Sequence, residues 1–463
     1  MRTKDTRKSV LRFLLPAMLL FCCAVITFLW LRLTASQRGD FKRIASETYD
    51  TVFLSMYPID TYDEADYLYF RAMTILKAEQ ILPDFSSLKK YMKRITQSGN
   101  QVSTVYLGLR PDKITAEELS SLAAAYPSIA FEVIVSYPSM EYWTGLSEGK
   151  YQKTLAAYCD FLTSACAVTG TRIYFYSDAE WLTANPSLYI NDWNLTADAS
   201  KYIMTHSDYL GGYQVTPENA ARLSSSFHEL VSTWRSAPPI YPDLSDTVVI
   251  FFGDSIFGNY SDGMSIPGVV HALTNAVVYN CGYGGNSAAM DEKTLITFPG
   301  IASAFAEQDL SVLPQNTQVC AGVTEYMNSL PQSGNLCFVV NYGVNDYLNG
   351  HPIFSDDPYD ITTFGGAVRT AVTCLKGNYP DAQIILCTPL YSARPSVTDT
   401  ANLQDYADAV VFLAHELDVD CIDNYRYLGI DSTNHQIYLT DLVHPNEQAR
   451  FIIAKQIISA IGK

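Results

Sequence analysis

Residues 247–255, TVVIFFGDS, decide the fold, because an apolar run leads without interruption into Gly253, Asp254 and Ser255. A short, continuous apolar run bounded by a turn is typical of a strand buried on both faces of a sheet. Similar runs recur later in the chain, separated by segments of helix length, at residues 276–279, 336–340, 383–387 and 420–422. Five buried strands with helical crossovers predict an α/β fold with a doubly wound parallel sheet.

The chain is long enough for two domains, since its 463 residues exceed the usual size of a single core. A proline-rich stretch, APPIYP, lies at residues 237–242, and proline neither continues a helix nor joins a central strand. We therefore expect an interdomain linker at residues 236–246. It would separate an N-terminal domain at residues 44–235 from a C-terminal domain at residues 247–463.

The N-terminal domain is expected to be a second α/β structure, because strand-like apolar runs alternate with helix-like segments. The expected strands are residues 102–107, 131–137 and 172–176, and the expected helices are 64–95, 116–125, 150–167 and 197–205. We find no catalytic motif in this half of the chain.

A membrane anchor is predicted at residues 13–31, FLLPAMLLFCCAVITFLWL, which carry no charge. These 19 residues would reach about 28 Å as a helix, close to the hydrocarbon core of a bilayer. Five basic residues in the tail 1–12 favour a cytoplasmic N-terminus, so the rest of the chain is expected outside the cytoplasm at the cell membrane. A cleavable signal peptide is the alternative interpretation, because small residues follow at 34–36.

The composition of the chain argues against nucleic acid as a partner. The formal net charge is −17, although residues 1–43 hold nine Lys and Arg against two Asp and Glu, so the remainder is strongly acidic. Nucleic-acid binding needs a basic surface. The ten cysteines show neither the C-x-x-C pairs nor the histidine spacing of zinc or redox sites, so no metal and no cofactor are expected.

Reactive side chains follow the predicted strands of the C-terminal domain, and the carboxyl ends of parallel strands meet at one edge of a sheet. Ser255 comes directly after the first strand, where a strand-to-helix turn exposes its hydroxyl. A glycine-rich turn, NCGYGGNS, follows the second strand at 280–287, and NYGVND follows the third at 341–346. Asp441 and His444 stand three residues apart in DLVHP, before a C-terminal helix. The set offers a nucleophile, a base, an acid that orients the base, and N–H donors for an oxyanion.

In this order GDS, the glycine turn, GVND and DLVHP resemble the conserved blocks of the SGNH (GDSL) hydrolase family, over residues 247–463. The resemblance implies a flavodoxin-like SGNH hydrolase fold and a serine hydrolase that acts on ester bonds without a cofactor. It assigns the catalytic triad to Ser255, Asp441 and His444.

The resemblance also implies an oxyanion hole made by Ser255, Gly285 and Asn345. Gly285 is chosen because the family's glycine directly precedes a polar pair, which here is Asn286-Ser287. The first block reads GDSI rather than GDSL, a conservative change that leaves the chemistry intact. Asp254 and Asp346 resemble the family's loop-stabilising acids. The N-terminal half resembles no family that we recognise.

Three functions are consistent with this sequence. The favoured one is a membrane-anchored, extracytoplasmic esterase that hydrolyses acyl esters, with O-acetyl the expected group, of a cell-envelope carbohydrate or lipid. An O-acyltransferase that modifies a cell-envelope glycan is the second, although several such transferases resemble the family while altering these blocks. A non-catalytic surface-binding protein that retains the scaffold is the third, and the intact triad argues against it.

Overall fold

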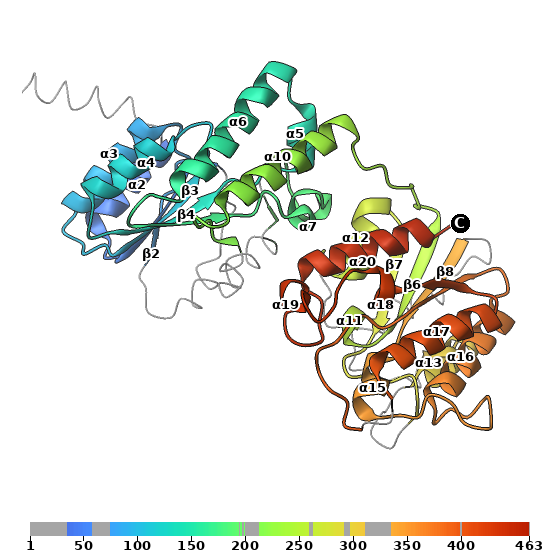
Figure 1. Ribbon diagram of the computed structural model, residues 1–463. Helices are drawn as coiled ribbons and strands as arrows, with labels where there is room; N and C mark the ends of the chain where they lie inside the picture. Colours follow the sequence, from blue (N-terminus) through green and yellow to red (C-terminus); the bar gives the residue numbers. More distant parts are fainter. Residues whose placement is uncertain are drawn as a thin grey trace, which may run out of the picture. The chain divides into compact units, whose positions relative to one another are not determined.

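The computed structural model describes residues 35–57, 75–193, 195–196, 199, 213–258, 263–290, 297–310, 335–398 and 401–462. The chain forms two compact units (Figure 1). Unit 1 comprises Met1–Asp178 and Asn191–Arg235, and unit 2 comprises Ala179–Ile190 and Ser236–Lys463. Each unit is an α/β structure with its own parallel sheet.

The sheet of unit 2 has five parallel strands in the order β10-β9-β8-β6-β7. Their bounds are β6 Thr247–Gly253, β7 Val277–Gly282, β8 Asn335–Asn341, β9 Gln383–Cys387 and β10 Asp420–Ile422. β6 pairs with β7 on one side and β8 on the other, so the strand order reverses beside β6. The expected α/β fold with a parallel sheet is confirmed, and such a reversal opens a crevice at the carboxyl ends of the strands.

Helices cover both faces of this sheet (Figure 1). Helices α12 Ile266–Thr274 and α20 Glu447–Ala460 pack together on one face. On the other face lie α13 Phe298–Ala306, α16 Phe364–Asn378 and α17 Leu403–Glu416. There the strand residues Phe252 and Phe338 meet Phe305, Leu375 and Leu413 in one buried apolar core. The described residues after β6 also form the short helices α11 Ser255–Gly258, α15 Val344–Asn349, α18 Asn424–Tyr427 and α19 His435–Tyr438.

Unit 2 also contains a segment that the sequence analysis assigns to the N-terminal domain. Residues Ala179–Ile190, with α7 Glu180–Thr183 and η2 Pro186–Leu188, belong to unit 2. Lys455 Nζ of α20 lies 2.9 Å from Glu180 Oε2, and Asn185 Nδ2 donates to the Gly263 carbonyl at 2.9 Å. The two units are therefore not consecutive in sequence, since the chain enters unit 2 once before it returns to complete unit 1.

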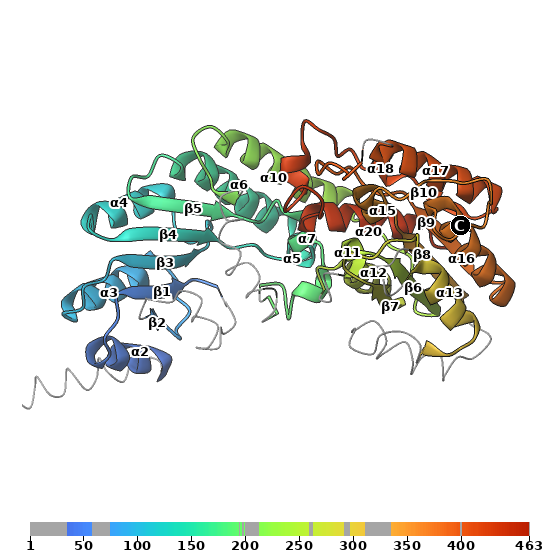
Figure 2. The same cartoon turned by 90° about the horizontal axis from the view of Figure 1, so that it is seen from below.

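The sheet of unit 1 also has five parallel strands, in the order β2-β1-β3-β4-β5 (Figure 2). Their bounds are β1 Thr51–Ser55, β2 Ile75–Lys77, β3 Thr104–Leu109, β4 Ala130–Val135 and β5 Thr171–Phe175. When the strands of each unit are numbered along the chain, both sheets have the order 2-1-3-4-5.

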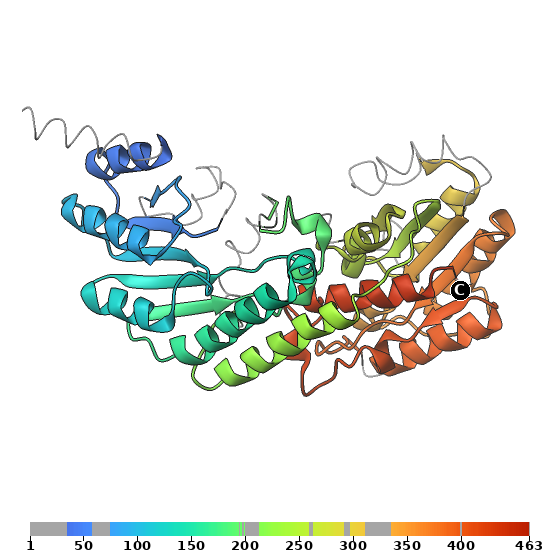
Figure 3. The same ribbon diagram turned by 90° about the horizontal axis from the view of Figure 1, so that it is seen from above.

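The described residues of unit 1 form the helices α2 Ala35–Ser46, α3 Phe85–Gln97, α4 Ala116–Ala125, α5 Met140–Gly145, α6 Glu148–Ala165 and α10 Ala220–Ser236. Helices α6 and α10 run side by side (Figures 1 and 3), and Tyr151 Oη of α6 lies 3.1 Å from Ser232 Oγ of α10. Trp143, Tyr158 and Phe227 pack edge to face or tilted against one another between these elements. Large aromatic rings therefore supply much of the buried apolar surface of this unit.

One prediction for unit 1 is wrong. A single helix was expected at residues 64–95, but residues 75–77 form β2 and α3 begins only at Phe85. Pro83 interrupts the helical pattern, and Asp84 caps α3 by accepting the Ser87 N–H at 2.8 Å. Strand β1 was not predicted, because a five-residue apolar run does not by itself distinguish strand from helix. The helix expected at 197–205 lies mostly outside the described residues.

The segment at residues 13–31, for which the sequence predicts a membrane anchor, lies outside the described residues. Among the helices of the described part of the chain, none has the length and apolar character that a bilayer crossing requires.

Candidate active site

Ser255 is the first residue of α11 and follows β6 after a single residue, Asp254. Asp254 is fully buried, and its Oδ1 accepts the Ile256 N–H at 2.9 Å. The Asp254 carbonyl accepts the Gly258 N–H at 2.8 Å, which closes the short helix. Ser255 is only 6 % exposed. The turn therefore holds the serine hydroxyl at the carboxyl edge of the sheet, with most of its surface covered.

Asp441 and His444 lie on one turn that precedes α20. Asp441 Oδ1 accepts the backbone N–H groups of Val443 and His444, each at 2.7 Å. The Thr440 N–H donates to the His444 carbonyl at 2.8 Å and closes the turn from the other side. One carboxylate oxygen thus shapes the backbone, and the second remains available to the imidazole.

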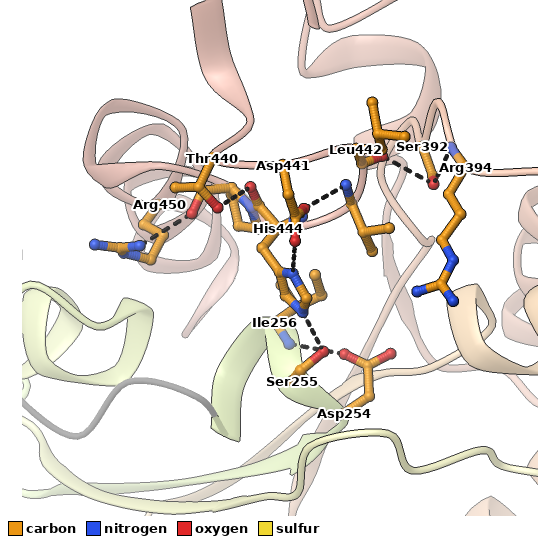
Figure 4. A network of polar contacts seen from close by, with 12 residues as sticks. Asp254, Ser255, Ile256, Ser392, Arg394, Thr440, Asp441, Leu442, His444 and Arg450 are labelled. Carbon is orange, nitrogen blue, oxygen red and sulfur yellow. Dashed lines mark hydrogen bonds and ion pairs between the residues drawn. The ribbon is translucent and has the colours of Figure 1, made fainter. Parts of the chain in front are cut away.

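The structure joins the three residues predicted for the triad in one chain of hydrogen bonds (Figure 4). His444 Nε2 lies 2.8 Å from Ser255 Oγ, and His444 Nδ1 lies 2.8 Å from Asp441 Oδ2. The side chain of His444 is 25 % exposed and that of Asp441 is 54 % exposed. Partial burial raises the pKa of Asp441, but hydrogen bonds from His444 and Val443 outweigh it and hold that pKa below its usual value. An ionised Asp441 favours a proton on Nδ1, which leaves Nε2 able to accept the serine proton.

The glycine turn after β7 lies directly against α11, because two glycines let the backbones touch. A Cβ on Gly258 would stand 2.5 Å from the Gly282 carbonyl carbon, and a Cβ on Gly282 would stand 2.7 Å from the Gly258 nitrogen. The Tyr283 N–H donates to the Gly253 carbonyl at 3.0 Å and ties the turn to the end of β6. Gly285 follows with φ +77°, a conformation that residues with a side chain rarely adopt.

Helix α15 carries Asn345 to the same edge of the sheet. Asn345 Nδ2 donates to the Asn286 carbonyl at 3.0 Å, so the amide is oriented by the residue that follows Gly285. The next residue, Asp346, is fully buried and accepts the N–H groups of Ala288 and Ala289 at 3.1 and 2.8 Å. These bonds hold the end of the glycine turn against α15.

The predicted oxyanion-hole residues lie on these three elements. Within the described part of the chain, neither the Ser255 N–H nor the Gly285 N–H has a hydrogen-bond acceptor. The Asn345 amide carries two N–H groups, of which the Asn286 carbonyl accepts one. Backbone and amide donors at a strand edge can stabilise a negative oxygen that develops beside the nucleophile.

Two buried carboxyl groups, Asp254 and Asp346, lie beneath this arrangement. Burial, with a smaller contribution from the nearby Asp346, raises the pKa of Asp254 to about 7, although the Ile256 N–H and the Asn345 amide act in the opposite direction. Burial likewise raises the pKa of Asp346, against its hydrogen bonds from the glycine turn. Both acids bond to backbone of the site, as the sequence analysis expects of loop-stabilising acids.

Arg450 is a site residue that the sequence analysis does not identify. It is fully buried on α20, and its Nε donates to the Met264 carbonyl at 2.9 Å while Nη1 donates to the Pro445 carbonyl at 3.0 Å. Its Nη2 lies 3.4 Å from Glu447 Oε1. One guanidinium thus joins the segment before α12 to the residue after His444. The sequence signal that could have found it is an arginine among the apolar residues of the last helix, because a buried arginine needs hydrogen-bond partners.

Among the described residues, no three His, Cys, Asp or Glu side chains are grouped so that they could hold a metal ion.

Residues 251–449 match the GDSL-like Lipase/Acylhydrolase family. The chain carries a GDSL-like hydrolase domain. This domain is therefore of the ester-hydrolysing serine hydrolase type, and the resemblance drawn from the sequence motifs is confirmed over residues 251–449.

Solved structures that are similar to this chain each cover about half of it. One is a protein from Lactobacillus plantarum, with 20 % identity and a TM-score of 0.36 over 48 % of this chain and 96 % of that one. A putative GDSL-like lipase from Parabacteroides merdae has 18 % identity and a TM-score of 0.32, over 48 % and 99 %. A member of the lipolytic G-D-S-L family from Veillonella parvula has 18 % identity and a TM-score of 0.32, over 47 % and 99 %. Among curated proteins, none matches the chain.

Proposed function

We propose that the GDSL-like domain is the extracytoplasmic catalytic part of a membrane-anchored esterase. Its substrates would be acyl esters, above all O-acetyl esters, of a cell-envelope carbohydrate or lipid. The observation that carries the catalytic proposal is the pair of 2.8 Å contacts that link Asp441 through His444 to Ser255. The cellular location rests on the sequence alone, with a basic tail at residues 1–12 before the apolar segment 13–31.

Ser255 is the nucleophile in this proposal. His444 Nε2 accepts the hydroxyl proton as Oγ attacks the ester carbonyl, and Asp441 holds the imidazole and stabilises its positive charge. The N–H groups of Ser255 and Gly285 and the Asn345 amide stabilise the tetrahedral oxyanion. His444 then gives the proton to the departing alcohol oxygen, and the acyl group remains as an ester on Ser255. A water molecule, deprotonated by His444, then attacks this acyl-serine. His444 returns the proton to Ser255 Oγ as the bond to the acyl group breaks and the carboxylic acid is released.

The proposal is tested by hydrolysis of p-nitrophenyl acetate and butyrate by the full chain, with and without a glycan acceptor. Wild type is compared with Ser255→Ala, and Ser245→Ala, an exposed serine in the segment before β6, is the matched control. Turnover in buffer alone that needs Ser255 but not Ser245 supports an esterase. Turnover that appears chiefly with the acceptor would assign acyl transfer instead. Absence of Ser255-dependent turnover in both conditions would overturn the catalytic proposal in favour of a surface-binding protein.

A further inference from the structure

Arg394 stands on the loop that follows β9, at the edge of the sheet where the proposed nucleophile lies. The Ala393 N–H donates to the Leu442 carbonyl at 2.9 Å, and Ser392 Oγ donates to the same carbonyl at 3.1 Å. Leu442 comes two residues before His444. The loop is therefore bound directly to the turn that carries the proposed base.

The far end of this loop is bound to α15, the helix that carries the proposed oxyanion amide. The Val397 N–H donates to the Leu348 carbonyl at 3.1 Å. Within the loop, the Arg394 N–H donates to Ser392 Oγ at 3.2 Å, and Pro395 confines the preceding backbone to extended conformations. Arg394 is thus held between two elements that bear proposed catalytic groups.

The side chain of Arg394 is exposed and runs from this loop in the direction of Asp254 and Ser255 (Figure 4). Within the residues described by the structure, its guanidinium forms no ion pair and no hydrogen bond. The other described Lys and Arg side chains of unit 2 all donate to a carboxylate or a carbonyl, namely Arg369, Lys376, Arg426, Arg450 and Lys455. Among the described residues of this unit, the unpartnered cation therefore stands on the loop that is bound to the turn of the proposed base.

A guanidinium offers N–H donors in a planar fork that matches the two oxygens of a carboxylate or phosphate. An exposed charge without a partner adds little to the stability of the fold. Because the Arg394 guanidinium has no partner among the described residues, it can bind an anionic group without first breaking a bond within the protein.

We infer that Arg394 recognises an anionic oxygen group on the substrate, so that the GDSL-like domain acts preferentially on esters that carry a carboxylate or phosphate near the scissile bond. Arg394 acts in this account as a specificity-determining residue and takes no part in the proton transfers. The inference rests on the proposed function, because the ester of the same molecule must reach Ser255.

Matched ester pairs that differ only in one anionic group test the inference with the full chain. The first pair is p-nitrophenyl butyrate and mono-p-nitrophenyl succinate, which place the carboxylate on the acyl side. The second pair is O-acetylgalactose and O-acetylgalacturonate, which place it on the alcohol side. The third pair is monoacetylglycerol and monoacetylglycerol phosphate, which separates phosphate from carboxylate. We expect wild type to prefer the anionic member of at least one pair.

Arg394→Gln should lower kcat/KM for that anionic ester roughly 10- to 100-fold, the usual effect of losing a charge-assisted hydrogen bond, and leave the neutral partner unchanged. The loss should lie mainly in KM. Arg394→Lys keeps the charge but not the fork and should be intermediate. Added salt should shrink the wild-type preference, because the charge is exposed.

Lys376→Gln is the matched control, since it removes one positive charge at the C-terminal end of α16, where Lys376 Nζ binds the Leu417 and Asp418 carbonyls that precede β10. It should affect both members of each pair equally, and the Arg394 variants should unfold at the temperature of wild type. A wild type without preference in every pair, or an Arg394→Gln that loses both members equally, would overturn the inference. Ser255-dependent turnover of neutral esters would then leave the proposed function standing, whereas absence of such turnover on all six esters overturns both.

Discussion

Replacing Asp441 with asparagine tests how the proposed base is oriented. Asparagine keeps the size of the side chain, and its Oδ1 can still accept the Val443 and His444 N–H groups, which lie at 2.7 Å in wild type. Its NH₂ group, however, stands where Oδ2 lies 2.8 Å from His444 Nδ1. Two N–H groups cannot bond, so Nδ1 must become the acceptor and the proton moves to Nε2. In that tautomer Nε2 cannot accept the proton of Ser255.

The size of the effect follows from the exposure of the carboxylate. In a serine protease triad with a buried aspartate, this change lowers kcat about 10⁴-fold. The Asp441 side chain is 54 % exposed, so water can reach the imidazole and restore part of the productive tautomer. We therefore expect kcat to fall about 10²- to 10³-fold, or about 3–4 kcal/mol of transition-state stabilisation. KM should change little, because Asp441 contacts His444 rather than the ester.

Steady-state hydrolysis of p-nitrophenyl acetate gives kcat, and thermal unfolding reports whether the turn is intact. Asp441→Ala is the comparison, because it also removes the two backbone hydrogen bonds and should therefore unfold at a lower temperature than Asp441→Asn. An Asp441→Asn variant that unfolds like wild type and retains wild-type kcat would refute the reasoning.

Three further outcomes test other parts of the site. Asn345→Ala should lower kcat about 10²- to 10³-fold by removing one oxyanion donor, and near-normal p-nitrophenyl acetate turnover would exclude that role. Gly285→Ala should cost about 1 kcal/mol of stability, because its Cβ meets no atom within 4 Å but its φ of +77° is unfavourable, and an unchanged Tm would contradict this. Burial raises the pKa of Asp254 from 3.8 to about 7, so the folded chain binds its proton more tightly than the unfolded chain. The resulting stabilisation, about 4 kcal/mol, is complete below pH 3.8 and is lost as the pH rises through 7. The free energy of unfolding in urea should therefore fall less across this pH range in Asp254→Asn than in wild type.

Sequence was most informative where apolar runs are short and bounded by turn residues. The predicted strands at 383–387 and 420–422 coincide with β9 and β10, because a run bounded by turn residues leaves little choice of ends. Ser255 and His444 could be identified from motifs at the end of a strand and before the last helix. In a doubly wound sheet these places lie close together, because the carboxyl ends of the strands meet at one edge. The 2.8 Å contact between them spans 189 residues, and only the folded sheet supplies it.

Other features depend on tertiary contacts that no local pattern encodes. The segment Ala179–Ile190 has the composition of an ordinary loop with a short helix, and its membership in unit 2 depends on partners such as Lys455 and Gly263. Arg394 likewise looks like a plain loop residue in sequence. Its significance comes from the bonds of its neighbours to Leu442 and from the lack of a partner for its own side chain within the described residues.

The two sheets share one strand order, so the residues at the sheet edge must account for chemistry being expected in unit 2 and not in unit 1. In unit 1 Ser55 of β1 pairs with Gly108 of β3, and in unit 2 Gly253 of β6 pairs with Asn341 of β8. Two residues beyond these pairs stand Tyr57 in unit 1 and Ser255 in unit 2.

The last helices extend this correspondence. Residues 215–223, VTPENAARL, lead into α10 as residues 443–451, VHPNEQARF, lead into α20, and Thr216 stands where unit 2 has His444. Tyr57 is buried and packs edge to face on Tyr137, at 5.8 Å between ring centroids, so its position is filled by an aromatic contact rather than a nucleophile. The strand order places an edge where a site can form, and the residues at that edge decide whether it reacts.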